Sequence, residues 1–555
     1  MNPAAMTAVP PAEAALIVRD RVCRHIDGLA IGSTVAALAD RGVLLHLVDR
    51  DRVTVGELRA RFGGNPGFLH VAVRLLADQG WVVCSGEYGT DRLELSATDE
   101  GRVVADFAFA YQRAAALPRT ALRLGDLFAQ ESRDAAVERA FAAALDEARA
   151  EWAVDPSLRP IGTRLQILAH LDGHLFAPVM AQLARQGGFG PERVPPSGRG
   201  GAVRRLVLDL LALAGWVTPG DDEGLLTAEG RVAARYAPQY WYPVGYLPLF
   251  AQVPELLFGE PVRDRYALGP APETHVDREL DIRFSGAVFA GVCRDRFLEV
   301  ALAPFDREPL QDQPASIVDT GCGDGTVLAE FHRAIRERTV RGANLGRHPL
   351  LAVGIEPSEA ARRVASARLA EAGVPHLMLD GDIGDPQGLV RMLADHGVDP
   401  DDALHITKSV LHNRRHTGAT VGRAHDAMPA FAGAYAAPDG SALTPSEVAD
   451  DLAALLRAWR GAIRRHGMVV VEAHAADPAL TAALAGRSIH TAQDATHGYS
   501  CQYPITPDAF AWAAGAAGLR CVAHREIGAQ SYGHVVLTVD HFVTTDDTAG
   551  GPHGE

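Results

Sequence analysis

The sequence predicts a mixed α/β chain that has a Rossmann-like domain at its C-terminal end and a mainly helical N-terminal half. Its 555 residues are too many for one hydrophobic core, so the length alone indicates several domains. From residue 315 onward, short apolar strand-like segments alternate with helical segments, which is typical of a parallel sheet. Before residue 235, two stretches share the helix and strand pattern of a winged helix and form an internal repeat.

The composition is that of a globular protein, with 47% hydrophobic and 22% charged residues. The sequence has no apolar run long enough to span a bilayer, and its first residues lack the features of a signal peptide. We therefore expect a cytoplasmic protein without a membrane partner. The net charge of -16 argues against a nucleic-acid partner, because binding to phosphate backbones needs basic patches. The six cysteines include no CxxC pair, so no disulfide framework or structural zinc site is indicated.

The internal repeat is visible in three pairs of matching segments. They are HIDG at 25–28 and HLDG at 170–173, LLADQGWVV at 75–83 and LLALAGWVT at 210–218, and the segments TDEGRV and TAEGRV that begin at Thr98 and Thr227. We expect a first winged-helix-like repeat with a long helical segment in residues 1–153, and a second repeat in residues 154–234. The second repeat is degenerate, because it lacks a clear counterpart of the first helix of the helix-turn-helix, residues 54–63.

The segment after the second repeat, residues 235–308, is unusually aromatic, with the run RYAPQYWYPVGYLPLF near its start. Aromatic side chains often line pockets, so we expect a helical lid over a substrate cleft, and the alternative is a connector that packs into a core. Linker character returns at 306–314. We place the catalytic domain at 309–545 and expect a disordered tail at 546–555.

The catalytic domain opens with ASIVDTGCGDGTVLAEF at 315–331, a short apolar strand followed by a glycine-rich turn and a helix. Its candidate cofactor-binding residues are Asp319, Gly321, Gly323 and Gly325. Glycines permit close backbone approach to a ligand, and the N-terminus of the following helix offers free N–H groups. A second strand at 350–358 ends near Glu356, whose carboxylate is placed to accept hydrogen bonds from a ribose diol.

Five further strands complete the predicted sheet, at 376–383, 401–407, 468–475, 519–527 and 532–542. The third strand places Asp382 and Ile383 where an adenine ring would lie. The glycines alone also fit an NAD-binding dehydrogenase. The acidic tip of the second strand and the hairpin at the end favour instead the sheet of class I methyltransferases, which these residues resemble, and the resemblance implies S-adenosylmethionine as cofactor.

Candidate catalytic residues follow the fourth and fifth strands, because ligands of open α/β sheets gather at the carboxyl ends of the strands. The fourth strand leads into Lys408 and His412, and the fifth carries Glu472 and His474. Beyond it, the segment DATHGYSCQYPI at 494–505 reads as a loop too polar to be buried without partners. These groups suit general acid–base catalysis by an imidazole or a mononuclear metal site. The simpler alternative is that they are exposed histidines in a chain with 22 of them.

Several segments together resemble the metal-dependent C-methyltransferases of polyketide loading modules, of the apratoxin and saxitoxin starter type. They are TVRGANLGRHPLLAVGIEPS, PHLMLDGDIGDP, DDALHITKSVLHNRRH, VVEAH and THGYSCQY, and the resemblance covers about residues 270–545. It implies a mononuclear iron or manganese near the methyl donor and methylation of a malonyl thioester at its α-carbon. It also implies His497 and Gln502 as metal ligands, to be completed by His412 or His474.

The chain departs from that pattern after the fourth strand, where His412-Asn413-Arg414 follows Leu411 without the usual Asp. The arrangement of Lys408 and His412 resembles small-molecule methyltransferases of the winged-helix type. In these, such a histidine is a general base for a hydroxyl group, or a metal ligand in C-methylating enzymes that act on 2-oxoacids.

Three functions are therefore compared. The first is metal-assisted C-methylation next to a carbonyl in natural-product biosynthesis, on a free small molecule or a carrier-protein-bound acyl group. The second is metal-free O-methylation with His412 as base. The third is a non-catalytic scaffold that only binds S-adenosylmethionine. One role open to the winged-helix repeats is the formation of a homodimer.

Overall fold

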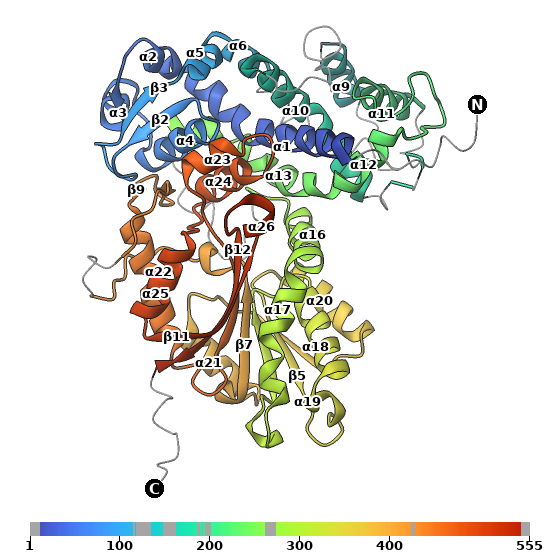
Figure 1. Ribbon diagram of the computed structural model, residues 1–555, viewed down its shortest axis with the longest axis vertical. Coiled ribbons are helices and arrows are strands. Elements are labelled where there is room, and N and C mark those ends of the chain that lie inside the picture. Colours follow the sequence, from blue (N-terminus) through green and yellow to red (C-terminus); the bar gives the residue numbers. More distant parts are fainter. Residues whose placement is uncertain are drawn as a thin grey trace. The chain divides into compact units, whose positions relative to one another are not determined.

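The computed structural model describes residues 12–114, 117, 135–147, 162–185, 189–190, 192–194, 201–260, 274–422 and 428–545. These residues form two compact units (Figure 1). The first unit contains the chain up to Phe284 and two later segments, Ala434–Ala442 and Asp477–Cys501. The second contains Ser285–Gly433, Leu443–Ala476 and the chain from Gln502 onward. The expected domains were contiguous, whereas two segments of the catalytic half fold with the N-terminal half. The expected tail at 546–555 lies outside the described residues.

A seven-stranded sheet forms the centre of the second unit, with strand order β11-β12-β10-β7-β4-β5-β6. Strands β4 to β7 and β10 pair in parallel, whereas β12 is antiparallel to both β10 and β11. The predicted Rossmann-like sheet with a terminal hairpin is therefore confirmed. The strands are β4 (Ser316–Thr320), β5 (Leu351–Ile355), β6 (His376–Leu379), β7 (Ala403–Lys408), β10 (Met468–Ala473), β11 (Leu519–Ile527) and β12 (Leu537–Thr544).

Helices cover the sheet on both sides (Figure 1). One group comprises α17 (Arg294–Ala301), α18 (Thr326–Arg338), α19 (Val340–Ala343) and α20 (Glu359–Glu371). The other comprises α21 (Pro386–Asp395), α22 (Pro445–Trp459) and α25 (Pro507–Ala516). The central strands β4, β5 and β10 are almost continuously apolar and buried, as expected of parallel strands that are covered on two faces.

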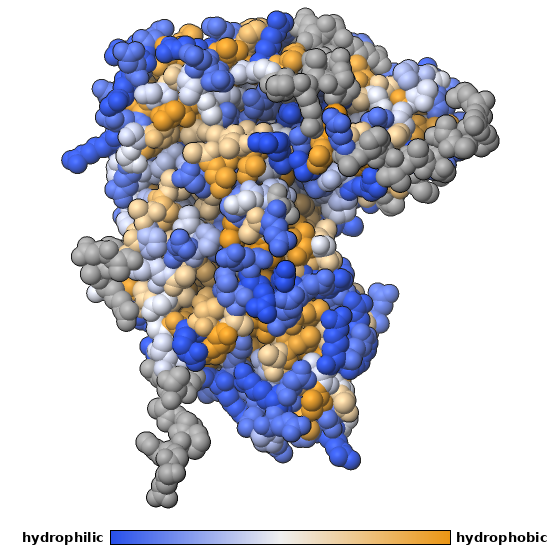
Figure 2. All heavy atoms as spheres, in the orientation of Figure 1, coloured by the Kyte–Doolittle hydropathy of each residue, from blue (hydrophilic) through white to orange (hydrophobic). Residues whose placement is uncertain are grey.

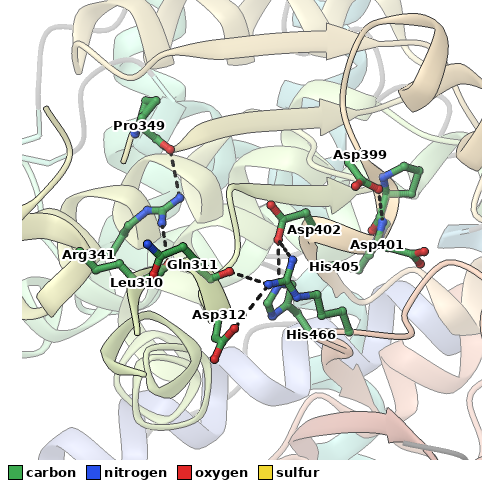
Figure 3. A network of polar contacts seen from close by, with 12 residues as sticks. Leu310, Gln311, Asp312, Arg341, Pro349, Asp399, Asp401, Asp402, His405 and His466 are labelled. Carbon is green, nitrogen blue, oxygen red and sulfur yellow. Dashed lines mark hydrogen bonds and ion pairs between the residues drawn. The ribbon is translucent and has the colours of Figure 1, made fainter. Parts of the chain in front are cut away.

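Polar contacts hold the linker at 306–314 against the amino ends of the strands (Figure 3). Arg465, which precedes β10, donates to the carboxylate of Asp402 at 2.7 Å and to the carbonyl oxygen of Gln311 at 2.5 Å. Arg341 donates to the carbonyl oxygen of Pro349 at 3.1 Å, just before β5. This network connects the start of the domain to the edge of the sheet where the parallel strands begin.

The first unit is built on two long helices, α1 (Ala12–Asp40) and α10 (Thr163–Arg185), which carry the HIDG and HLDG segments. The first repeat continues with α2 (Val43–Val48), β1 (Val53–Thr54), α3 (Val55–Phe62), α4 (Pro66–Asp78), β2 (Val82–Ser85), β3 (Glu94–Ala97), α5 (Asp99–Asp106), α6 (Ala108–Ala114) and α9 (Ala135–Glu147). The second continues with α11 (Gly201–Leu213) and α12 (Ala228–Tyr236). The expected long helix after the first repeat is interrupted, because α5 ends at Asp106, and part of its range lies outside the described residues.

Helix α4, the second helix of the helix-turn-helix, is buried from Gly67 to Asp78. It packs against two helices from the segment Asp477–Cys501, α23 (Pro478–Ala483) and α24 (His490–Tyr499). The buried guanidinium of Arg74 joins them, since it binds Asp78 at 2.6 Å and Asp494 at 2.8 Å. The second helix of the helix-turn-helix is therefore part of the core of this unit.

The aromatic run after the second repeat forms short helical turns, namely a 3-10 turn (Ala237–Tyr240), α13 (Trp241–Gly245), α14 (Leu247–Phe250) and α15 (Val253–Phe258). Its aromatic side chains are largely buried within the first unit, among them Tyr240, Tyr242 and Phe250. This is the behaviour expected of the core-packing connector rather than of an open lid. Helix α16 (Arg278–Val288) and a π-helical turn (Phe289–Cys293) then lead into the second unit.

No helix in the described part of the chain is long and apolar enough to cross a membrane. The face drawn in Figure 2 shows hydrophilic and hydrophobic residues interspersed rather than a continuous apolar band.

We predict that Gly28→Ala lowers the free energy of unfolding by roughly 1–3 kcal/mol, because a Cβ atom at this position would lie 2.2 Å from the carbonyl oxygen of His170. The matched control is Gly515→Ala in α25, where no atom lies within 4 Å of the added methyl group. It should be neutral or stabilise by up to about 1 kcal/mol. Chemical unfolding measures both, and equal effects of the two substitutions would contradict the prediction.

Candidate active site

The candidate site lies in the second unit, where the parallel strands end. Asp319 is the penultimate residue of β4, Lys408 is the last residue of β7, and Glu472 is the penultimate residue of β10. Glu356 follows the last residue of β5. The structure therefore brings these four side chains to one edge of the sheet, as the strand pattern predicts.

The glycine-rich turn after β4 has the backbone geometry that its sequence predicts. Gly321, Gly323 and Gly325 all have positive φ, at 82°, 53° and 76°, a conformation that glycine adopts at little cost. The amide of Gly321 donates to the carbonyl oxygen of Ile355 at 2.7 Å, which fastens the turn to β5. A Cβ on Gly321 would lie 2.4 Å from a methyl group of Val410, so only glycine fits here.

Glu356 supports this turn from the neighbouring strand. One carboxylate oxygen accepts a hydrogen bond from the amide of Gly323 at 3.1 Å, and the other accepts one from the amide of Ser358 at 3.0 Å. The side chain is only half-buried, so it retains lone pairs for a ligand hydroxyl.

Asp382 and Ile383 lie in the turn that follows β6. The carboxylate of Asp382 accepts a hydrogen bond from the amide of Gly384 at 2.9 Å. The carbonyl oxygen of buried Ile383 accepts one from the indole of Trp459 at 3.1 Å. Both residues thus hold a tight turn beside the glycine-rich one.

Asp319 is the most unusual acid at this edge. Its side chain is buried, and one carboxylate oxygen has no hydrogen-bond partner. Burial raises the pKa of Asp319 to about 8, the Glu356 carboxylate adds to the rise, and the Lys408 ammonium opposes it. A buried carboxyl group without a partner is costly, so this position fits a group that receives a donor from a ligand.

Lys408 is the only lysine among the 53 basic residues of the chain. Its ammonium group donates to the hydroxyl of Ser285 at 2.8 Å. Helix α16 thereby runs past the end of β7, and it also passes the glycine-rich turn, since a Cβ on Gly286 would lie 3.5 Å from the carboxylate of Asp324.

These observations fit S-adenosylmethionine. The glycine-rich turn leaves no room for side chains, Glu356 offers acceptors for a ribose diol, and the unpartnered oxygen of Asp319 accepts from an ammonium or hydroxyl donor.

His412 lies on a 3-10 turn (Leu411–Asn413) that follows β7, and it is buried. Its Nδ1 atom is in contact with a carboxylate oxygen of Glu472 on β10. The second oxygen of Glu472 is buried and has no hydrogen-bond partner. Sequence reasoning singled out both residues, and the structure shows that they form a pair.

His474 differs from His412 because both of its ring nitrogens are engaged by protein groups. Nδ1 faces the carbonyl oxygen of Ile505 at 3.1 Å, and Nε2 faces the hydroxyl of Thr538 at 2.8 Å. Burial lowers the pKa of His474, and the Glu472 carboxylate opposes this. These contacts describe a histidine that holds strands together, and they offer no ring nitrogen to a substrate or a metal.

Arg414 is a site residue that sequence reasoning passed over. It is buried and binds Asp451 of α22 at 2.9 Å, the carbonyl oxygen of Leu411 at 3.1 Å and that of Val448 at 2.6 Å. Burial lowers the pKa of Arg414, and the Asp451 carboxylate opposes this. Its guanidinium also lies 5.7 Å from the ring centre of Tyr503.

The amide of Tyr503 in turn donates to the carbonyl oxygen of His412 at 2.7 Å. The turn that carries His412 is therefore bonded through Leu411 to Arg414 and through His412 itself to Tyr503. No local pattern marks this role, because Arg414 is one of many arginines and its partners Asp451 and Val448 lie more than 30 residues away.

The segment 494–505 does not form the expected loop. Residues up to Tyr499 belong to α24, where His497 is buried in the first unit. The helix is satisfied by partners in that unit, such as the 2.8 Å hydrogen bond between the hydroxyls of Thr34 and Tyr499. The expectation of a loop is wrong for the residues up to Tyr499, whereas the polar groups are buried together with partners, as their polarity requires.

The three predicted metal ligands are divided between the units. His497 belongs to the first, whereas Gln502 and His412 belong to the second. Within the residues that the structure describes, no group of three His, Cys, Asp or Glu side chains is placed to hold a metal ion. The metal therefore stays a prediction.

We predict that Glu356→Ala weakens the binding of S-adenosylmethionine by at least about 1 kcal/mol, because both the ribose acceptor and the support of Gly323 are lost. Titration calorimetry measures the change. The control is Glu359→Ala, which removes an exposed carboxylate three residues away. Equal affinities of the two variants would refute this role of Glu356.

We also predict that Arg414→Lys lowers kcat on the order of 10²-fold while the affinity for S-adenosylmethionine stays unchanged, because the turn that carries His412 is displaced. A lysine keeps the charge and loses the guanidinium fork that binds Asp451 and two carbonyl groups. Steady-state kinetics and calorimetry test this against Arg363→Lys, a change at an exposed position. A wild-type kcat in Arg414→Lys would show that the contacts of Arg414 do not act on His412.

Solved structures of related shape include three methyltransferases. The mitomycin 7-O-methyltransferase MmcR is 14% identical (TM-score 0.30), and the match covers 92% of this chain and 94% of that one. An O-methyltransferase family 2 protein from Planctomyces limnophilus DSM 3776 in complex with apigenin is 11% identical (TM-score 0.34; 97% and 98%). The DszA carbon methyltransferase is 14% identical (TM-score 0.36; 97% and 94%). At these TM-scores the likenesses carry no argument about activity. No protein of curated function matches the chain.

Three protein families match successive parts of the chain. Residues 18–84 match the AprA N-terminal domain, residues 172–260 the AprA winged helix domain, and residues 273–537 the AprA MT2-like domain. The last match contains the glycine-rich turn, Glu356 and the pair formed by His412 and Glu472. The chain is therefore an AprA-like, S-adenosylmethionine-dependent methyltransferase with AprA-type N-terminal and winged-helix domains ahead of its MT2-like domain.

Proposed function

We propose that this methyltransferase methylates a hydroxyl group of a small-molecule or carrier-bound metabolite, with His412 as general base. The observation that carries the proposal is the contact between Nδ1 of His412 and the buried carboxylate of Glu472. A carboxylate that accepts from Nδ1–H fixes the tautomer in which Nε2 is the proton acceptor, and it stabilises the imidazolium that forms. In this tautomer His412 can act as a general base through Nε2.

The reaction needs one proton transfer and one methyl transfer. When bound, S-adenosylmethionine supplies an electrophilic methyl group on its sulfonium. Nε2 of His412 takes the proton of the acceptor O–H as the oxygen attacks the methyl carbon. The sulfonium of bound S-adenosylmethionine would supply the methyl group and keep the electron pair of the broken S–CH₃ bond, and His412 would pass the proton to water. Glu472 holds the ring throughout, and Arg414 holds the backbone that carries it.

A C–H group next to a carbonyl is a second acceptor for the same base. The resemblance to polyketide loading-module enzymes favours this acceptor together with a metal. One structural observation also supports it, because the hydrogen bond between Tyr503 and His412 brings Gln502 beside the turn of His412. The unpartnered carboxylate oxygen of Glu472 adds a further oxygen atom that could bind a metal there. Gln502 and His412 are then the ligand candidates of the second unit.

We predict that His412→Ala lowers kcat about 10²- to 10⁴-fold, the range of general acid–base catalysis, without a change in the affinity for S-adenosylmethionine. Glu472→Gln should lower kcat less, since the base remains and only its orientation is lost. The control is His396→Ala, which removes an exposed histidine after α21. The measurement is methyl transfer to a panel of hydroxylated and β-carbonyl acceptors.

Exhaustive chelation, with elemental analysis of the purified protein, separates the two acceptors. Full turnover after chelation supports base-catalysed methylation. Loss of turnover that returns with iron or manganese supports the metal-assisted reaction instead. A chain that binds S-adenosylmethionine and turns over no acceptor, or a fully active His412→Ala, would overturn the proposal.

A further inference from the structure

The two repeats of the first unit are built in the same way at equivalent positions. In the first, the amide of Thr98 donates to the carbonyl oxygen of Trp81 at 3.0 Å, and in the second the amide of Thr227 donates to that of Trp216 at 3.0 Å. Each threonine also caps the next helix, because its hydroxyl accepts from the amide three residues later. The similarity seen in the sequence is therefore one of structure, and equivalent residues can be compared one by one.

The repeats meet where α1 and α10 cross, and the contact there is reciprocal. A Cβ on Gly28 would lie 2.2 Å from the carbonyl oxygen of His170. A Cβ on Gly173 would lie 2.3 Å from the carbonyl oxygen of His25. Each glycine of one HxDG segment thus receives the backbone of the histidine of the other.

The two histidine side chains also contact the opposite half of the unit in a reciprocal way. Nδ1 of His25 in the first repeat is bonded to the hydroxyl of Tyr240, which follows the second repeat, at 2.8 Å. Nδ1 of His170 in the second repeat is bonded to the hydroxyl of Tyr111, which belongs to the first, also at 2.8 Å. Each histidine is therefore bonded to a tyrosine that lies 13 residues after the capping threonine of the opposite repeat, Thr227 for Tyr240 and Thr98 for Tyr111.

The tryptophans follow the same rule. The ring of Trp216 lies 6.2 Å from that of His25 at an interplanar angle of 50°, and the ring of Trp81 lies 6.0 Å from that of His170 at 48°. Three independent kinds of contact, between backbones, hydrogen-bonding groups and rings, thus relate the repeats by the same interchange.

Such interchange, in which residue i meets residue j and j meets i, is the property of an interface between two identical subunits related by a two-fold axis. Here both halves belong to one chain. We infer that the second repeat occupies the place of a partner subunit, so that the chain contains its own dimer interface and works as a monomer with one catalytic domain.

Burial explains why no second copy can use this surface. His25, Gly28, His170 and Gly173 are all buried within the unit, and so are Tyr111 and Tyr240. A second chain could reach these groups only by displacing α1 or α10. The homodimer that winged-helix repeats suggested is thereby replaced by an interface within the chain.

Sedimentation equilibrium of the full chain with S-adenosylmethionine tests the inference. The expected mass is that of one chain, 59.0 kDa, at every micromolar concentration loaded. Two differently tagged copies expressed together should not copurify, and the activity per chain should not change on dilution. A mass of two chains, or copurification of the two tags, would overturn the inference. This includes a dimer in which two chains exchange their α1 helices.

Paired substitutions give a second test that does not depend on one variant. Tyr111→Phe and Tyr240→Phe should lower the midpoint of thermal unfolding by similar amounts, and both midpoints should be independent of protein concentration. Tyr532→Phe, an exposed position in the second unit, is the control. Midpoints that rise with protein concentration would mean that the contacts join two chains.

Discussion

A charged group that leaves water must meet a partner, and this constraint decides where the working parts of the protein lie. Arg414 and Asp451 are both buried, and breaking such a pair costs far more than an exposed pair contributes. Their union fixes the turn after β7 against α22. Glu472 is buried beside His412 for the same reason. In the first unit, Arg74 joins α4 to a segment that comes from the catalytic half of the chain. Removing one partner of such a pair costs free energy of folding, so each pair fixes the backbone segments that carry it.

The parts of the fold that depend on local pattern were predictable. Alternating apolar segments and glycine turns report directly on strands and on backbone conformation, so β4, β5, Glu356 and the glycines were assigned from the sequence alone. The repeat was equally clear, because matched tryptophans and threonines recur in order.

The parts that depend on distant partners were not predictable. Nothing local marks Arg414 as different from other arginines, and its partner lies 37 residues away. The segment 494–499 was expected to be a loop that needs partners if buried, but the sequence could not identify those partners, because Thr34 and Arg74 stand more than 400 positions earlier. His474 shows the opposite case. Its place after the fifth strand predicted a catalytic role. Only the structure shows that its two ring nitrogens face the carbonyl oxygen of Ile505 and the hydroxyl of Thr538.

The presence of a single lysine has a practical consequence. Because every other basic side chain is an arginine, the chain offers one ε-amine, and it lies at the edge of the sheet where the methyl donor is expected to bind. Reductive methylation with ¹³C-formaldehyde would give one side-chain resonance besides that of the terminal amine. Its chemical shift would report on the charge around Lys408 in solution, without any engineered label.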